Sequence, residues 1–214
     1  MNSLIAGALI AGLAMSSTPA SIDPDAGLDT IQTRADRATE ERIRAIDSAL
    51  NRLDGADSLT DDHRVSIVET LTADRAAMEE LQAQIAAETD RGNALDAYQS
   101  IFTDYRVFAV SIPQALYTVG ADRLTEVALP RLERAYDGLA TISDDTEALA
   151  ELRAAIDQAT DLAGGIADAA LAVEPSDYND NSTVLAELRL KLREAAAATR
   201  DAASAARDLW NEER

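Results

Sequence analysis

The sequence predicts an all-α protein, an elongated antiparallel bundle of about five helices with coiled-coil-like packing. Three observations support this fold class. The 214 residues contain only 9 glycines and 5 prolines, and alanine, the strongest helix former, makes up much of the 47% hydrophobic content. Apolar residues recur at alternating steps of three and four, which is the period of a helix. No segment alternates with a period of two, so we expect no sheet.

The first two helices follow from clear start and stop signals. A helix is expected over about Leu28–Leu53, because Asp54–Gly55 then forms a turn in which glycine suits a left-handed cap. Thr60 is a good N-cap for a second helix, and Gly92–Asn93 is expected to end it. Their apolar stripes are formed by Ile43, Ile46, Leu50 and Leu53, and by Ile67, Leu71, Met78, Leu81 and Ile85.

The third helical segment, residues 94–142, is the longest and contains Pro113 and Pro130. Each proline removes a helical hydrogen bond and collides with the preceding turn, so each should kink or break the helix. Two arrangements of the 28–214 bundle remain open. In one, two three-helix units in tandem share the kinked helix 94–142. In the other, the chain breaks at Pro113 and folds into one compact bundle. The helix lengths favour the elongated arrangement.

The last two helices carry the most regular pattern. Ser143–Asp145 supplies capping residues for a fourth helix, Gly164–Gly165 interrupts it, and Glu174–Pro175 ends it before a polar loop and a fifth helix. The stripes are formed by Leu149, Leu152, Ile156, Ala159, Ala163, Ile166, Ala170 and Val173, and by Leu185, Leu188, Leu192, Ala195, Thr199, Ala202, Ala206 and Leu209. Runs of more than three heptads indicate knobs-into-holes packing of antiparallel neighbours. Such seams can be satisfied within one chain or between chains, so an oligomer is compatible with the sequence.

The first residues differ from the rest of the chain. Leu4–Met15 is an unbroken run of apolar and small residues, too short to span about 30 Å of hydrocarbon but as long as the core of a signal peptide. Thr18 and Ala20 are small residues at the positions that a cleavage site requires. We expect a signal peptide over residues 1–20, a linker over 21–27 and export of the protein. An uncleaved anchor or a misassigned start codon are the alternatives, because no lysine or arginine precedes the run.

Composition excludes several classes of function. The chain has no cysteine and one histidine, His63, so thiol chemistry and multi-histidine metal sites are excluded. The formal net charge of −20 predicts repulsion from nucleic acids, whose binding depends on lysine and arginine. His63 is expected to be a solvated surface histidine, since its place in the first turn of a helix disfavours the imidazolium. No pair of carboxylates is marked for acid–base work. We therefore expect no enzymatic activity, no cofactor, no metal site and no stable membrane span.

Aromatic side chains gather in one part of the chain. The candidate ligand or partner surface consists of Tyr98, Phe102, Tyr105, Arg106, Phe108 and Tyr117. Residues at this helical spacing either line a groove for an apolar ligand or partner helix, or form the thickest part of the core. The core is the more frequent outcome for such a stripe.

Two stretches resemble segments of a protein family. Thr103–Phe108 (TDYRVF), followed by Pro113, is similar to a TDYRVY segment, and Pro175–Asn179 (PSDYN), followed by Val184–Leu185, is similar to a P-x-D-W-N loop that opens a final helix. Both segments occur in uncharacterised, exported, all-helical proteins of high-GC Gram-positive bacteria. The resemblance implies export and a helical fold, and it brings no activity, cofactor or catalytic residue.

These observations lead to one functional expectation and one alternative. The expectation is a non-enzymatic exported bundle that acts as an interaction or structural module in the cell envelope or extracellular space, with an unknown protein or envelope component as its partner. The alternative is a binding module that uses the aromatic segment 98–117 for an apolar ligand or a partner helix.

Overall fold

The computed structural model describes residues 26–213, so the predictions for the signal peptide 1–20 and for most of the linker 21–27 lie outside the described residues. Within 26–213 the structure is 82% helical, has no strand and packs its helices antiparallel, which confirms the all-α prediction. The elements are α1 (Leu28–Leu53), α2 (Asp61–Ala87), α3 (Arg91–Thr103), α4 (Ser111–Asp122), the π-helical segment η1 (Arg123–Ala128), α5 (Leu129–Leu139), α6 (Thr146–Ala163), α7 (Ile166–Leu171), α8 (Pro175–Asp180) and α9 (Val184–Glu212).

The expected number of about five helices is wrong. The described part of the chain has seven helices of eleven or more residues, and α7 and α8 are short additions of six residues each. Two of the five expected segments are divided, for separate physical reasons. The segment 94–142 is interrupted after α3, and the fourth helix is divided between α6 and α7.

The bounds predicted for the first helix are confirmed, but Gly55 does not adopt the expected left-handed conformation, and the end predicted for the second helix is wrong. α1 spans Leu28–Leu53, and the Thr60 hydroxyl accepts a hydrogen bond from the His63 N–H at 3.3 Å, as an N-cap does. α2 ends at Ala87, and Gly92–Asn93 lies instead in the first turn of α3. The reason is that Asp90 acts as an N-cap, with its carboxylate accepting the Asn93 N–H at 2.9 Å.

The predicted helix 94–142 breaks over residues 104–110, ahead of Pro113. Arg106 has a φ of 48°, a left-handed conformation that is uncommon for a residue other than glycine and cannot continue an α-helix. Ser111 then begins α4 and donates a hydrogen bond to Asp74 of α2, whose pKa is raised by burial. This restart places Pro113 in the first turn of α4, where its missing N–H leaves no helical bond unmade.

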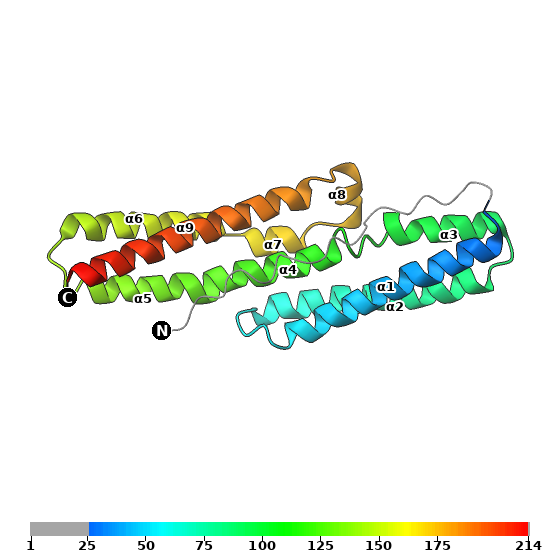
Figure 1. The fold of residues 1–214 in the computed structure, drawn as a ribbon, viewed down its shortest axis with the longest axis horizontal. Helices are drawn as coiled ribbons and strands as arrows, with labels where there is room; N and C mark the ends of the chain where they lie inside the picture. The colour runs from blue at the N-terminus through cyan, green and yellow to red at the C-terminus, as the bar shows by residue number, and fades with distance from the viewer. Residues whose placement is uncertain (1–25, 214) are drawn as a thin grey trace.

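Pro130 does not interrupt the continuous run of helix from α4 to α5. The chain passes from α4 through η1 into α5 without a gap, and Pro130 lies in the first turn of α5. A π-turn shifts the hydrogen bonds by one residue, which accommodates the N–H that proline lacks. In Figure 1 α4 and α5 accordingly follow one another along one line.

The fourth expected helix is divided at Gly164–Gly165. Gly165 has a φ of 70°, in the left-handed region that glycine adopts without strain. The chain therefore ends α6 at Ala163 and restarts as α7 at Ile166. The polar loop that follows contains the short α8, held by a capping box in which the Glu174 N–H donates to the Asp177 carboxylate at 2.8 Å.

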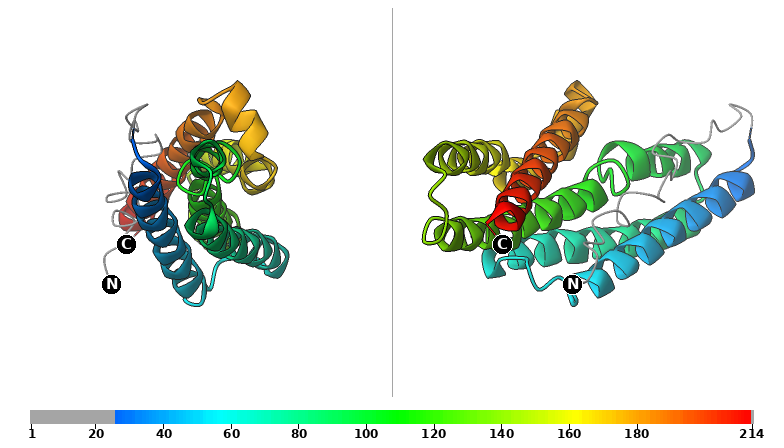
Figure 2. Two further views of the ribbon diagram at one scale, coloured as in Figure 1. Left: turned by 90° about the vertical axis from the view of Figure 1, so that its right-hand side faces the viewer. Right: turned by 60° about the vertical axis from the view of Figure 1, so that its left-hand side comes forward.

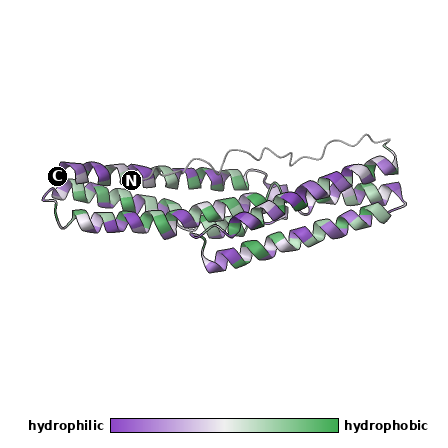
Figure 3. Ribbon diagram, turned by 60° about the horizontal axis from the view of Figure 1, so that its bottom comes forward, coloured by the Kyte–Doolittle hydropathy of each residue, from purple (hydrophilic) through white to green (hydrophobic). Residues whose placement is uncertain are grey.

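The helices are spread along one long axis. α1, α2 and α3 pack together at one end, α5, α6 and α9 pack together at the other, and α4 and α7 lie between them (Figure 1). Viewed along the long axis, most of the helices are seen partly end-on and tilted relative to one another, as the left view of Figure 2 shows. Hydrophilic residues recur along the long helices in Figure 3, as expected for amphipathic helices with one buried face.

The buried residues form separate clusters along the axis. One cluster joins α1, α2 and α3 around Ile31, Met78 and Ile101. Another joins α5, α6 and α9 around Ile156 and Ala202. The α6–α9 contact is the most extensive between any two described helices, and alanines on both helices form much of it, so the helices can approach closely.

Candidate functional site

The structure places the aromatic segment largely in the core. Tyr98 is 3% exposed and Phe102 is 6% exposed, with their rings edge-to-face at 5.2 Å between centroids. Tyr105, Phe108 and Tyr117 are partly buried. Burial raises the pKa of Tyr117, although Arg189 and Arg193 of α9 oppose this shift. The hypothesis that this segment takes an apolar ligand stays a prediction.

A buried arginine at the centre of these rings was missed by the sequence reasoning. Arg42 of α1 is 3% exposed, and its guanidinium carbon lies 4.4 Å from the Phe102 ring centre and 4.8 Å from that of Phe108. It donates to the Ala38 carbonyl at 2.9 Å, and its Nε has no hydrogen-bond partner within the described chain. Burial lowers the pKa of Arg42 to about 10. The available signal was its position, four residues after Ala38 and four before Ile46 on an apolar stripe.

Arg106 brings the two stretches of the family resemblance together. Its Nε and Nη2 donate to the Asn179 side-chain oxygen at 2.8 and 2.6 Å, and its guanidinium lies 5.3 Å from the ring centre of Tyr178. The Asn179 amide in turn donates to the Thr103 carbonyl at 2.9 Å. The segment between α3 and α4 is therefore bound to α8, and through α8 to the beginning of α9. Through these contacts the two stretches hold each other in place, which gives both of them a structural role.

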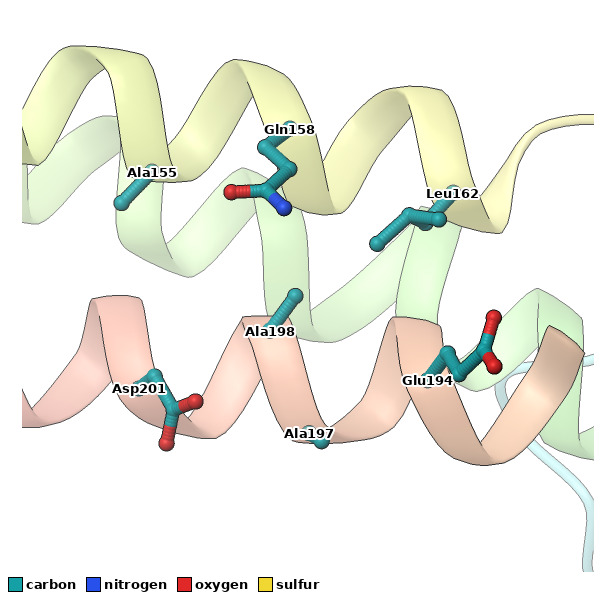
Figure 4. A pocket seen from close by; sticks show the side chains of 7 residues that line it. All are labelled: Ala155, Gln158, Leu162, Glu194, Ala197, Ala198 and Asp201. Atoms are coloured by element: carbon teal, nitrogen blue, oxygen red, sulfur yellow. The ribbon is translucent and has the colours of Figure 1, made fainter. Parts of the chain in front are cut away.

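An elongated groove follows the outer face of the α6–α9 pair, on the side away from α5 (Figure 4). It begins as a hollow of about 420 Å³ lined by Ala155, Gln158, Leu162, Glu194, Ala197, Ala198 and Asp201. A second hollow of about 380 Å³ shares Ala155 and extends toward the end of α9, lined also by Ala148, Glu151, Leu152, Ala205, Asp208, Leu209 and Glu212. We call the two hollows together the α6–α9 groove.

The floor of the groove is a consequence of small side chains. Ala155 and Leu162 of α6 and Ala198 of α9 lie between the two helices in Figure 4, with the charged groups around them. Alanine leaves a shallow channel where a larger residue would fill the space between the helices. The spacing of these alanines predicts only a close approach of two helices, because periodicity does not show which side of a helix pair is left uncovered.

Polar bridges cross the α1–α2 seam at the other end of the molecule. Arg75 bonds Asp47 at 2.8 Å, Gln82 bonds Asp36 at 2.5 Å, and Gln32 reaches the Ile85 carbonyl at 3.1 Å. The charged partners of α6 lie elsewhere. Arg153 pairs with Glu133 of α5 at 2.5 Å and with Asp157 of α6 itself at 2.7 Å. The described side chains therefore leave the outer seam of α6 and α9 without a polar bridge.

The rim of the groove is acidic. Its exposed charged residues are Glu151, Glu194, Asp201, Asp208 and Glu212, and no lysine or arginine lines either hollow. None of these five carboxylates forms an ion pair with another described residue. In a chain of net charge −20, such a rim attracts cationic groups and repels anions.

The fold and this groove define a class of protein, an antiparallel helical bundle with an open, acid-rimmed interhelical face. The chain matches no family model, no curated protein and no solved structure. Over residues 26–213, no group of three or more histidine, aspartate or glutamate side chains is placed to hold a metal ion. No helix in the same range combines the length and hydropathy of a membrane span.

Proposed function

We propose that this protein is a non-enzymatic interaction module that docks an amphipathic, basic helix of a partner protein in the α6–α9 groove. The observation that carries the proposal is the combination, along one channel, of an alanine floor with an unpaired acidic rim. An alanine floor admits the apolar side chains of an incoming helix at short distance between the helix axes. The apolar side chains form a stripe along the incoming helix, and lysine or arginine residues on both sides of this stripe can reach the rim carboxylates.

The rim contributes mainly to selection and to the rate of association. Exposed ion pairs add only about 0.2–1 kcal/mol each, whereas complementary potentials raise the association rate and disfavour partners of the wrong charge. A second copy of this chain is a poor occupant, because each copy carries a net charge of −20. Because the rim carboxylates are exposed to solvent, salt screens their attraction for a basic helix, and binding is expected to weaken as the salt concentration increases.

The docking proposal predicts selective binding of a basic helical peptide. The probe is a fluorescein-labelled 18-residue helix with a Leu/Ala stripe flanked by lysines, and its counterpart carries glutamates at the flanking positions. Fluorescence anisotropy should show saturable binding of the basic peptide alone. The double variant Glu194→Arg and Asp201→Arg should weaken binding at least tenfold.

A matched variant separates docking from net charge. Glu69→Arg with Glu80→Arg makes the same change in charge on exposed positions of α2, far from the groove. It should weaken binding less than threefold. Equal loss in the two double variants, or equal binding of both peptides, would show that the peptide responds to overall charge, and the docking proposal would fail.

We propose in addition that the module acts outside the cytoplasm. The support is the uncharged run Leu4–Met15 followed by small residues at Thr18 and Ala20. Mass spectrometry of the envelope and medium should detect a protein that begins at Ser21. An intact Met1 on a protein confined to the cytoplasm would contradict export and would leave the docking proposal to its own test.

A further inference from the structure

The only histidine lies at a junction of three helices. His63, in the first turn of α2, places its Nδ1 2.9 Å from both carboxylate oxygens of Asp122 on α4, and its Nε2 3.2 Å from Asp168 of α7. The Thr60 N–H donates to Asp122 at 2.9 Å. The expectation of a solvated surface histidine is therefore wrong, because the tertiary fold brings two carboxylates from distant parts of the chain to its ring.

The two carboxylates differ in their access to water. The Asp122 side chain is 3% exposed, whereas the Asp168 side chain is 83% exposed. Burial lowers the pKa of His63, but hydrogen bonds to Asp122 and Asp168 outweigh this effect and raise it above its ordinary value.

The other charged groups at this end of α2 are directed elsewhere. From α4 and α7, only Asp122 and Asp168 come within 4 Å of a ring nitrogen among the described residues. On α2 itself, Asp61 and Asp62 are exposed. Arg64 donates to the carbonyls of Leu53, at the end of α1, and of Ala56, in the turn before α2.

Protonation decides how many of these contacts form. The imidazolium has two N–H groups and satisfies both carboxylates, whereas neutral imidazole has only one. The buried Asp122 retains that N–H, because water cannot replace it there. The Nε2 lone pair then faces the carboxylate of Asp168, which is free to turn into solvent.

We propose that His63 is a pH-operated latch that joins α2 to the Asp168 turn of α7 when protonated and loosens this junction when neutral. α7 keeps Ile166 and Ala170 buried and stays packed against α4, so the loosening is a local shift of this short helix next to Gly164–Gly165. Because the folded-state pKa of His63 is raised, the latch stabilises the fold fully below about pH 6.5. This contribution is lost as pH rises through the folded-state value.

The absence of cysteine permits a direct test. Glu69→Cys on α2 and Ala169→Cys on α7 are exposed positions that take spin labels at these two sites alone. Pulsed electron paramagnetic resonance should give one narrow distance distribution at pH 5. At pH 8.5 the distribution should be broader and shifted to longer distances. The pH midpoint of this change should match the His63 titration followed by NMR in the same protein.

Two variants keep the test specific. In His63→Gln the side chain does not titrate, so the distance distribution should be the same at both pH values. In Asp168→Asn the amide can donate to or accept from Nε2, so α7 should stay joined at both values. An unchanged distribution in the protein with both Glu69→Cys and Ala169→Cys, or the same pH response in the His63→Gln variant, would overturn the latch.

Discussion

Replacing Ile156 with alanine is expected to lower the free energy of unfolding by about 2–5 kcal/mol, the range for isoleucine deletions in a packed core. Ile156 is 0% exposed and lies in the cluster that joins α5, α6 and α9. The buried α9 residues of this cluster are mostly alanines, whose short side chains cannot move into the space that the substitution leaves. The cavity term should therefore add to the lost transfer free energy.

Ile142 provides the matched control for this prediction. It follows α5 in the turn before α6 and is 50% exposed, so Ile142→Ala removes the same atoms and should cost less than about 1 kcal/mol. Urea unfolding should be followed by circular dichroism and by the fluorescence of Trp210, which reports on the end of α9. Equal losses in the two variants would show that the α6–α9 contact is not a packed core.

Replacing Arg42 with alanine is expected to cost about 2–4 kcal/mol. The guanidinium lies between Phe102 and Phe108, and each cation–π contact is worth about 0.5–2 kcal/mol. The aliphatic stem also fills space between α1 and α3, so its deletion leaves a void between the two rings.

Arg42→Met separates charge from volume at the same site. Methionine keeps most of the volume and can lie against both rings, and it removes the cost of burying a cation without a carboxylate partner. We expect the free energy of unfolding of this variant to lie within about 1 kcal/mol of that of the parent protein. Thermal or urea unfolding of both variants is the measurement. A methionine variant as unstable as the alanine variant would mean that the positive charge itself holds this cluster together.

Local sequence signals predicted the helix ends that are marked by capping or turn residues. The bounds of α1 and the Thr60 cap of α2 were predicted, because a cap depends on residues within one turn of each other. The break over residues 104–110 was not predicted at its position. Proline marks where a helix is disfavoured, but the contact of Ser111 with Asp74 lies between residues far apart in the sequence.

The candidate sites also combine features that the sequence predicts with contacts between residues far apart in the chain. The aromatic segment was recognisable by its spacing, yet the cation between two of its rings comes from α1. The alanines of α6 and α9 were visible as apolar positions, whereas the groove beside them depends on which face of the pair is left uncovered.

The sequence by itself determined that this protein is helical, acidic and without cysteine chemistry, since composition and apolar period act locally. Only the tertiary structure decided that His63 meets two carboxylates, that Arg42 lies between aromatic rings, and that one helix pair presents an open acidic channel. The physical reason is that pairing and exposure depend on which helix faces adjoin. Many helix arrangements satisfy the same apolar stripes, and only the packed fold selects one of them.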